Sequence, residues 1–203
     1  MRFVAFFLLL IALPVLADEQ VSICYNYGCR AHAEIVYGGE QLRILGKIMG
    51  RAHNAAEERQ AISLAVGRLL DWAGKQSPIW ADRGGNAEDG GVDGEMDCID
   101  HSTTTTRLLQ MMDRLGLLRY HRVRSVARRT RFVLFEHFAA QIEEIEAEKT
   151  NMGNAGKTED ASTDESNTAP RYVVDSWFFN NGHPAEVMPL ARWLAGEGPE
   201  VGN

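Results

Sequence analysis

Apolar residues recur at helical spacing between residues 40 and 72, with a break near Gly50. Such a period is typical of amphipathic helices whose apolar stripe faces a protein core. The sequence therefore predicts two helices in this region. Their stripes are formed by Leu42, Leu45, Ile48 and Met49, and by Ile62, Ala65, Val66, Leu69 and Leu70.

A long loop and a further helix follow. From Gly74 to Glu95 the helical pattern gives way to Gly, Asp, Asn and Pro, which predicts a loop. The next segment, MDCIDHSTTTTRLLQMMDRLGLL, has one apolar side, with Asp97 placed to cap a helix and Gly116 placed to end it. Residues 102–106 are Ser and Thr, which have weak helix propensity, so packing must supply the stability of this helix.

The second half of the chain is richer in β-branched and aromatic residues. Three strands are predicted within residues 121–127, 131–146 and 171–179. Residues 147–170 separate the last two and contain almost no large apolar residue, so a disordered insertion in a hairpin is expected. The tail, 184–194, carries apolar positions for a short final helix. Helices followed by strands predict an α+β fold.

The first residues have the pattern of a signal peptide. Arg2 precedes a short apolar run, and Val15 to Ala17 form a small-residue cleavage site, so we expect residues 1–17 to be removed. The run is shorter than the ~20 residues of a comfortable membrane span, so a retained anchor is the less favoured alternative. Residues 18–203 then form one domain that is periplasmic or secreted, without stable membrane insertion.

Charge narrows the set of partners. The formal net charge is -7, which argues against a general nucleic-acid binder because phosphate neutralisation needs a basic surface. One basic segment, Arg119 to Arg131, contains six arginines. It can be a groove for an acidic substrate, but such a segment is more often the solvated face of two strands.

The three cysteines have different settings. Cys24 and Cys29 lie close together in CYNYGC, where Asn and Gly permit a turn, so a local disulfide is expected in an oxidising compartment. Cys98 is then the odd thiol. An unpaired cysteine in an exported protein is either buried and inert or kept for its reactivity.

Cys98 falls at the predicted start of a helix, where the helix dipole favours thiolate. The neighbouring Asp97 and Asp100 oppose a further negative charge, so the thiol needs a base. His137 lies in an apolar strand, where an imidazole needs a polar partner. Asp175 lies in the next strand, and antiparallel neighbours can place the two side by side. The three residues have the order and settings of an activated nucleophile, its base and an orienting carboxylate.

Other polar residues are candidates for roles at the same site. His101 is close enough to Cys98 in sequence to be a second-choice base. A second oxyanion donor, beside the amide of Cys98, is expected from the preceding loop, where Trp80 and Asn86 are candidates.

A metal site has little support from the spacing. The chain has no HxxxH pair and no C-x2-C motif. Asp89, Asp93 and Asp97 recur in a Gly-rich loop and can hold calcium, although the sequence pattern of a calcium loop is absent. We therefore expect no cofactor, with calcium as the alternative.

These residues resemble a known family. The string EMDCID, 95–100, resembles the G-x-C-x-D signature of bacterial transglutaminase-like cysteine peptidases, and EHFAAQIE and YVVDSWF resemble their H-A-x-V-E-V and W-x-V-x-D-P strands. The resemblance covers roughly residues 78–180. It implies a papain-like, transglutaminase-core fold with the nucleophile helix packed on an antiparallel sheet. It also implies that Cys98 is the nucleophile, His137 the general base and acid, and Asp175 the orienting carboxylate.

The chain departs from the family pattern at three places. Met96 and Asp97 stand where Gly or Gly-Asp commonly precedes the cysteine, threonines follow in place of small residues such as Ala, and Ser176 replaces a Pro. Two functions are therefore expected. The first is an exported thiol enzyme that cleaves or transfers acyl groups of protein or peptide amides. The alternative is an inactive transglutaminase-like domain that serves as a binding or structural module in the envelope.

Overall fold

The chain forms a mixed structure of helices and antiparallel sheets. The computed structural model describes residues 17–85, 91–131, 135–145 and 169–199. The elements are β1 (Glu19–Tyr25), β2 (Ala31–Tyr37), α1 (Gly39–Met49), α2 (Ala55–Gly74), the 3-10 turn η1 (Pro78–Ala81), α3 (Cys98–Arg114), β3 (His121–Arg131), β4 (Phe135–Glu144), β5 (Arg171–Asp175), β6 (Glu186–Pro189) and α4 (Leu190–Leu194). The α+β class expected from the sequence is confirmed.

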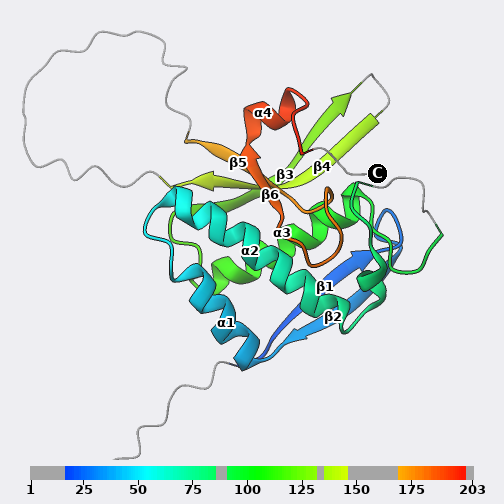
Figure 1. The fold of residues 1–203 in the computed structure, drawn as a ribbon, viewed down its shortest axis with the longest axis horizontal. Helices are drawn as coiled ribbons and strands as arrows, with labels where there is room; N and C mark the ends of the chain where they lie inside the picture. The colour runs from blue at the N-terminus through cyan, green and yellow to red at the C-terminus, as the bar shows by residue number, and fades with distance from the viewer. Residues whose placement is uncertain (1–16, 86–90, 132–134, 146–168, 200–203) are drawn as a thin grey trace, which may run out of the picture.

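Two antiparallel sheets enclose the long helix α3. Strands β1 and β2 form a hairpin, and β3, β4, β5 and β6 follow one another in a four-stranded sheet. Helix α3 packs against β1 on one side and against β4 on the other, as Figure 1 shows near the centre of the molecule. The start of α3 therefore lies between the hairpin and the larger sheet.

The expected order of elements is wrong at both ends of the domain. The chain begins with the β1–β2 hairpin and not with helices, and β6 occupies part of the tail predicted as helix. Buried and more exposed positions alternate along both hairpin strands, with Val21 and Ile23 buried in β1 and Ile35 and Tyr37 buried in β2. This period of two is the mark of a half-buried strand. The same alternation can be read in the sequence of both strands.

The predicted helices are confirmed. Helices α1 and α2 are separated after Gly50, and the side chain of Asn54 caps α2 by accepting from the amide of Glu57 at 2.9 Å. Helix α3 begins at Cys98, and Gly116 follows its end with a left-handed φ of 68°. The side chain of Thr104 is buried in α3 and accepts a hydrogen bond from the amide of Cys24 at 3.1 Å. Packing against β1 thus supports a segment with weak helix propensity.

The three predicted strands are present as β3, β4 and β5, but β3 continues to Arg131, and β5 ends at Asp175 although the prediction extended to residue 179. Strand β4 pairs with β5 in an antiparallel register that joins Ala140 to Val174. Three arginines of β3 are engaged with acidic side chains of β4: Arg122 and Arg124 pair with Glu143, and Arg128 pairs with Glu136. This pairing supports the solvated-face interpretation of the basic segment.

Two expectations concern residues that the structure leaves undescribed. The signal peptide, 1–17, lies outside the described residues except for Ala17, and the insertion, 147–170, lies outside them except for its last two residues. Both stay predictions. None of the helices in the described ranges is long and apolar enough to cross a membrane.

Candidate active site

His137 and Asp175 are in direct contact. His137 lies on β4, Asp175 is the last residue of β5, and the two strands are hydrogen-bonded neighbours. The Nε2 atom of His137 lies 2.7 Å from Oδ2 of Asp175. This is the length of a charge-assisted hydrogen bond. The sheet therefore brings together the histidine and the carboxylate predicted from the sequence.

The side chain of Asp175 accepts hydrogen bonds from three residues. Its side chain is 1% exposed, and besides His137 it accepts the indole Nε1–H of Trp193 at Oδ2, 3.0 Å away. The amide of Trp177 donates to its Oδ1 at 3.2 Å. Three donors therefore satisfy both oxygens of this buried side chain and fix its orientation.

Aromatic rings fix the orientation of the His137 imidazole. The ring centroids of Trp177, Trp193 and Phe178 lie 4.8, 5.6 and 5.7 Å from that of His137. The side chain of His137 is 13% exposed. Because Asp175 occupies Nε2, Nδ1 is the ring nitrogen left for other partners.

Sequence reasoning missed Trp193. It lies on the short helix α4, is fully buried, and contacts both members of the histidine–carboxylate pair. The guanidinium of Arg129 stacks over its ring at 4.5 Å. The tail pattern identified Trp193 only as an apolar anchor, and no spacing in the sequence relates it to Asp175. A Trp in a core also needs a partner for its N–H, and that requirement was the available signal.

Cys98 lies against β4 beside His137. It is the first residue of α3, and its Sγ lies 3.8 Å from the carbonyl oxygen of Glu136, the residue that precedes His137. The amide of Phe138, which follows His137, also interacts with the sulfur. The sulfur thus contacts the backbone on both sides of His137. Cys98 is partly exposed and has a free thiol.

The surroundings of the resting thiol favour its neutral form. Burial is the largest influence and raises the pKa of Cys98, and the carboxylates of Asp97 and Asp175 raise it further. The amides of Phe138 and of Cys98 itself lower it, but the net direction is upward. Nucleophilic attack therefore requires a base that takes the thiol proton and leaves a compensating positive charge.

The carboxylates that flank Cys98 are bound by the β1–β2 turn. Asp97 caps α3 through Oδ1, and its Oδ2 accepts the amide of Gly28 at 2.9 Å. Asp100 accepts the amide of Tyr27 at 2.8 Å and that of Cys29 at 2.6 Å. The sequence predicted the cap by Asp97 and the repulsion that both carboxylates exert on a thiolate, but it did not predict these backbone donors.

The turn that supplies these amides has an unusual backbone. All four residues from Asn26 to Cys29 have left-handed φ values, between 56° and 68°. Only Gly28 adopts this conformation freely, and each other residue costs about 1 kcal/mol or more. A disulfide joins Cys24 to Cys29 and closes the turn. Such strain persists only where surrounding contacts determine the conformation, here the disulfide and the carboxylates of α3.

His101, the second-choice base, is engaged elsewhere. It is 2% exposed, its Nδ1 lies 2.9 Å from the hydroxyl of Ser176, and its Nε2 lies 3.2 Å from Oδ2 of Asp82. The last pair is close enough for charge attraction but lacks hydrogen-bond geometry. Burial lowers the pKa of His101, but Asp82 outweighs this, and the net direction is upward. With both nitrogens facing these partners, His101 is not available as a base for Cys98.

Ser176 belongs to the group of buried polar residues that surrounds His101. Besides contacting His101, its hydroxyl lies 2.9 Å from that of Thr105 on α3. Asp82 in turn accepts the amide of Met96 at 3.1 Å. The network therefore joins α3, the loop that leads to Cys98 and the residue after Asp175. Thr105 and Ser176, which are in contact here, stand at two of the places where the chain departs from the motifs of transglutaminase-like peptidases.

The candidate calcium ligands are only partly described. Asp89 lies outside the described residues. Asp93 accepts the side-chain amide of Asn26 at 3.0 Å, and both oxygens of Asp97 accept backbone amides. Within the described ranges, Cys24, Cys29 and Asp100 lie close enough to share an ion, but the disulfide occupies both sulfurs.

The two candidate oxyanion donors are not assigned by the structure. Trp80, on η1, is 70% exposed, and Asn86 lies outside the described residues. The amide of Cys98 at the start of α3 remains the expected donor, because helix N-termini present free N–H groups.

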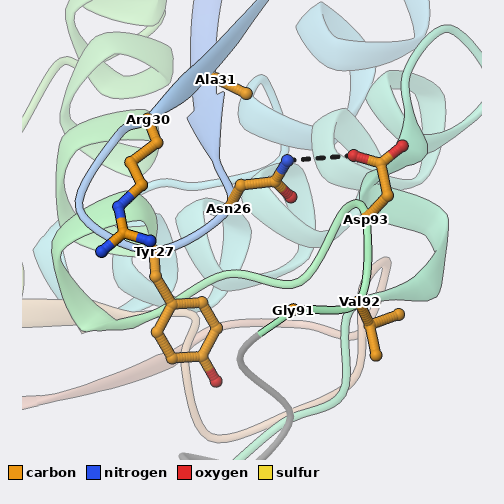
Figure 2. Close-up of a pocket in the computed structure, with 7 residues that line it drawn as sticks. All are labelled: Asn26, Tyr27, Arg30, Ala31, Gly91, Val92 and Asp93. Carbon is orange, nitrogen blue, oxygen red and sulfur yellow. Dashed lines mark hydrogen bonds between the residues drawn. The ribbon is translucent and has the colours of Figure 1, made fainter.

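A pocket lies next to this helix start. It has a volume of about 590 Å³ and is lined by Asn26, Tyr27, Arg30, Ala31, Gly91, Val92 and Asp93. One wall is thus the turn that binds Asp97 and Asp100, and the other is the loop that leads to Cys98. The side chain of Asn26 joins the walls, because it donates to Asp93 and accepts the amide of Gly94 at 2.8 Å. Arg30 and Asp93 lie on opposite sides of the pocket (Figure 2).

Comparison with known proteins finds no matching family model, curated protein or solved structure. The resemblance to transglutaminase-like cysteine peptidases therefore depends on the short motifs around Cys98, His137 and Asp175.

Proposed function

We propose that this chain is a thiol enzyme of the transglutaminase-like, papain-related class, which cleaves or transfers acyl groups of protein or peptide amides. One observation carries the proposal: His137 is hydrogen-bonded to buried Asp175 at 2.7 Å, while the sulfur of Cys98 contacts the backbone on both sides of His137. Helix α3 packed on the antiparallel sheet also agrees with the nucleophile helix of that class.

In the proposed reaction, Nδ1 of His137 takes the proton from Cys98, and Sγ attacks the carbonyl carbon of a substrate amide. The tetrahedral intermediate collapses when the imidazolium gives that proton to the departing nitrogen, which leaves as an amine. A thioester remains on Cys98. Water or a second amine then attacks the thioester, again losing its proton to His137, and Sγ departs to restore the free enzyme.

Asp175 supports this cycle by stabilising the imidazolium and by holding its ring. A carboxylate at 2.7 Å from Nε2 fixes the proton on that nitrogen in the resting state and offsets the positive charge that appears after proton transfer. Trp193 keeps Asp175 in place through its own hydrogen bond. In the proposed cycle, Nδ1 is therefore the nitrogen that takes and gives the proton.

The substrate side chain next to the scissile bond is proposed to enter the pocket of Figure 2. Arg30, Tyr27 and Val92 give this pocket a cation, an aromatic ring and an apolar surface. The proposed location is outside the cytoplasm, either periplasmic or secreted, since a local disulfide is typical of oxidising compartments.

A direct test uses a mixture of envelope proteins as substrate together with a labelled primary amine. Wild-type protein is expected to generate new N-termini, or to attach the amine to proteins, with both products identified by mass spectrometry. The matched controls are Cys98→Ala and His137→Ala, which remove the nucleophile and the base. Equal product patterns for wild type and Cys98→Ala would contradict the proposal.

One observation favours a second candidate, an inactive domain that acts as a binding or structural module. Burial, Asp97 and Asp175 all raise the pKa of Cys98, as expected for a thiol that is never used. Iodoacetamide separates the two candidates. Rapid alkylation of Cys98 near neutral pH that is lost in His137→Ala supports the enzyme, while a thiol that reacts only after denaturation supports the module.

A further inference from the structure

The β1–β2 turn points consecutive backbone amides at the two carboxylates that flank the nucleophile. The amides of Tyr27, Gly28 and Cys29 donate in order to Asp100, Asp97 and again Asp100, at 2.8, 2.9 and 2.6 Å. Consecutive N–H groups in one concave turn form an anion-binding nest. Here the anions belong to the protein itself, on either side of Cys98.

These amides counteract an electrostatic effect that works against the thiolate. Asp97 raises the pKa of Cys98, so any group that offsets the charge of Asp97 assists ionisation of the sulfur. Burial and the charge of Asp97 raise the pKa of Asp100, whereas the amides of Cys29, Asp97 and Tyr27 lower it. The turn therefore stabilises negative charge at the start of α3, where the thiolate must form.

The disulfide is the covalent support of the turn. It closes a loop of left-handed residues that otherwise prefer other conformations. Cys24 is fully buried in β1, where its amide binds Thr104 of α3, while Cys29 is partly exposed at the end of the turn. Without the disulfide, β1 keeps its contact with α3 but the turn loses the link that holds its amides in place.

We propose that the Cys24–Cys29 disulfide is a positioning element for Cys98, so that reduction of this disulfide lowers the reactivity of the nucleophile. The inference rests on the proposed function, because it concerns the same thiol. The disulfide acts through the turn, whose amides hold and offset the carboxylates of Asp97 and Asp100. The oxidised chain is the active form.

The reduction is a thiol–disulfide exchange with a dithiol such as dithiothreitol. A reductant thiolate attacks Sγ of the more exposed Cys29, and Cys24 leaves as a thiolate. The second reductant thiol then attacks the mixed disulfide and releases Cys29. Two electrons pass to the protein, and the dithiol becomes a cyclic disulfide.

The test measures the rate at which iodoacetamide alkylates the Cys98 peptide, read by mass spectrometry across a range of pH. Oxidised protein is compared with protein reduced by dithiothreitol and freed of it anaerobically, and with Cys24→Ala/Cys29→Ala. Both altered forms are expected to react about tenfold more slowly near neutral pH, equivalent to an upward shift of one unit in the pKa of the thiol. Reoxidation of the wild type is expected to restore the rate.

Two variants at Gly28 separate the effect of the turn amides on Cys98 from the effect of the disulfide. Gly28→Pro keeps the disulfide but lacks the amide that binds Asp97 and cannot adopt the φ of 68°. Gly28→Ala keeps the amide, and its added methyl group meets no atom within 4 Å, although alanine at this positive φ costs about 1 kcal/mol. The proposal expects slow alkylation for Gly28→Pro and a nearly wild-type rate for Gly28→Ala. Equal rates for the two would overturn it, whatever happens to the double alanine variant.

The outcomes distinguish this inference from the proposed function. If oxidised wild type is unreactive, or is unaffected by His137→Ala, the proposed function fails. If it is reactive and depends on His137 but is indifferent to reduction and to Gly28→Pro, only the inference fails. Circular dichroism of each form shows whether a slow rate comes from a folded protein, and slow rates seen only in unfolded forms also count against the inference.

Discussion

Replacing Asp175 by Asn removes a charge while nearly preserving shape. The amide oxygen can take the position of Oδ2 and accept from His137 and Trp193, but the NH₂ group then opposes the amide of Trp177. The opposite rotamer of the new asparagine is less favourable, because its NH₂ group would then face two donors, the ring N–H groups of His137 and Trp193. Asp175→Asn therefore keeps the imidazole near its place and removes the charge that stabilises the imidazolium.

The size of the effect follows from these contacts. A hydrogen bond to a charged group contributes about 1.5–3 kcal/mol, and the lost charge weakens the imidazolium by this order. With about 1.36 kcal/mol per tenfold change in rate, reaction through the thiolate–imidazolium pair should slow about 10- to 150-fold. One effect works in the opposite direction, since the Asp175 charge also raises the pKa of Cys98. The direct contact with His137 should outweigh it.

The assay is alkylation of Cys98 near neutral pH, with thermal unfolding measured on the same samples. Glu186→Gln is the matched control, because Glu186 is the cross-strand partner of Asp175 and also carries a carboxylate, but on β6. We expect wild-type reactivity in Glu186→Gln and slow reaction in folded Asp175→Asn. Equal rates in the two variants would refute the role given to Asp175.

Three further predictions concern residues around the site. Asp97→Asn keeps an oxygen that can cap α3 but loses a charge that raises the pKa of Cys98. The pH midpoint of Cys98 alkylation should therefore fall. An unchanged or higher midpoint would contradict this prediction. Protonated His101 stabilises the fold, because its pKa is higher in the folded protein than in the unfolded chain. This contribution is complete below about pH 6.5, the pKa in the unfolded chain, and is lost as the pH rises through the pKa in the folded protein. Urea midpoints should therefore decline above that pH in wild type, and His101→Gln should lack this decline. Gly94→Ala places a Cβ 2.0 Å from a backbone carbonyl at a φ of 99°, and should cost well over the ~1–3 kcal/mol expected from conformation alone. Gly91→Ala, at a φ of 121° with open space around it, is the control in a thermal melt.

The sequence predicted those parts of the site whose residues carry a local pattern. Asp97 and the apolar side of 96–118 located the start of α3, and hence Cys98, because caps and helical periodicity are local properties. His137 and Asp175 stood out as polar residues in apolar strands. Their meeting followed from strand order, since consecutive strands usually pair.

The missed parts depend on contacts between distant segments or on backbone groups. Trp193 reaches Asp175 only because α4 packs beside β5, and no local pattern records this contact. The binding of Asp97 and Asp100 by the β1–β2 turn uses backbone amides, which every residue except proline has. A sequence therefore shows the two carboxylates but not the donors that bind them.

The interpretation of His101 changed for a similar reason. Its closeness to Cys98 in the sequence made it the second-choice base. In the structure its ring instead faces Asp82, which comes from the loop before α3, and Ser176, which comes from the residue after β5. Tertiary contacts therefore decide which partners each histidine has.

The central claim is that His137 takes the proton of Cys98 to form a thiolate–imidazolium pair. The most direct measurement is the ultraviolet absorbance of the thiolate as pH is varied, with Cys98→Ala as the blank. We expect the pH midpoint of thiolate formation to be lower in oxidised wild type than in His137→Ala, because the imidazole takes the thiol proton while the other surroundings of Cys98 favour the neutral thiol. The same midpoint in the two proteins would contradict this claim.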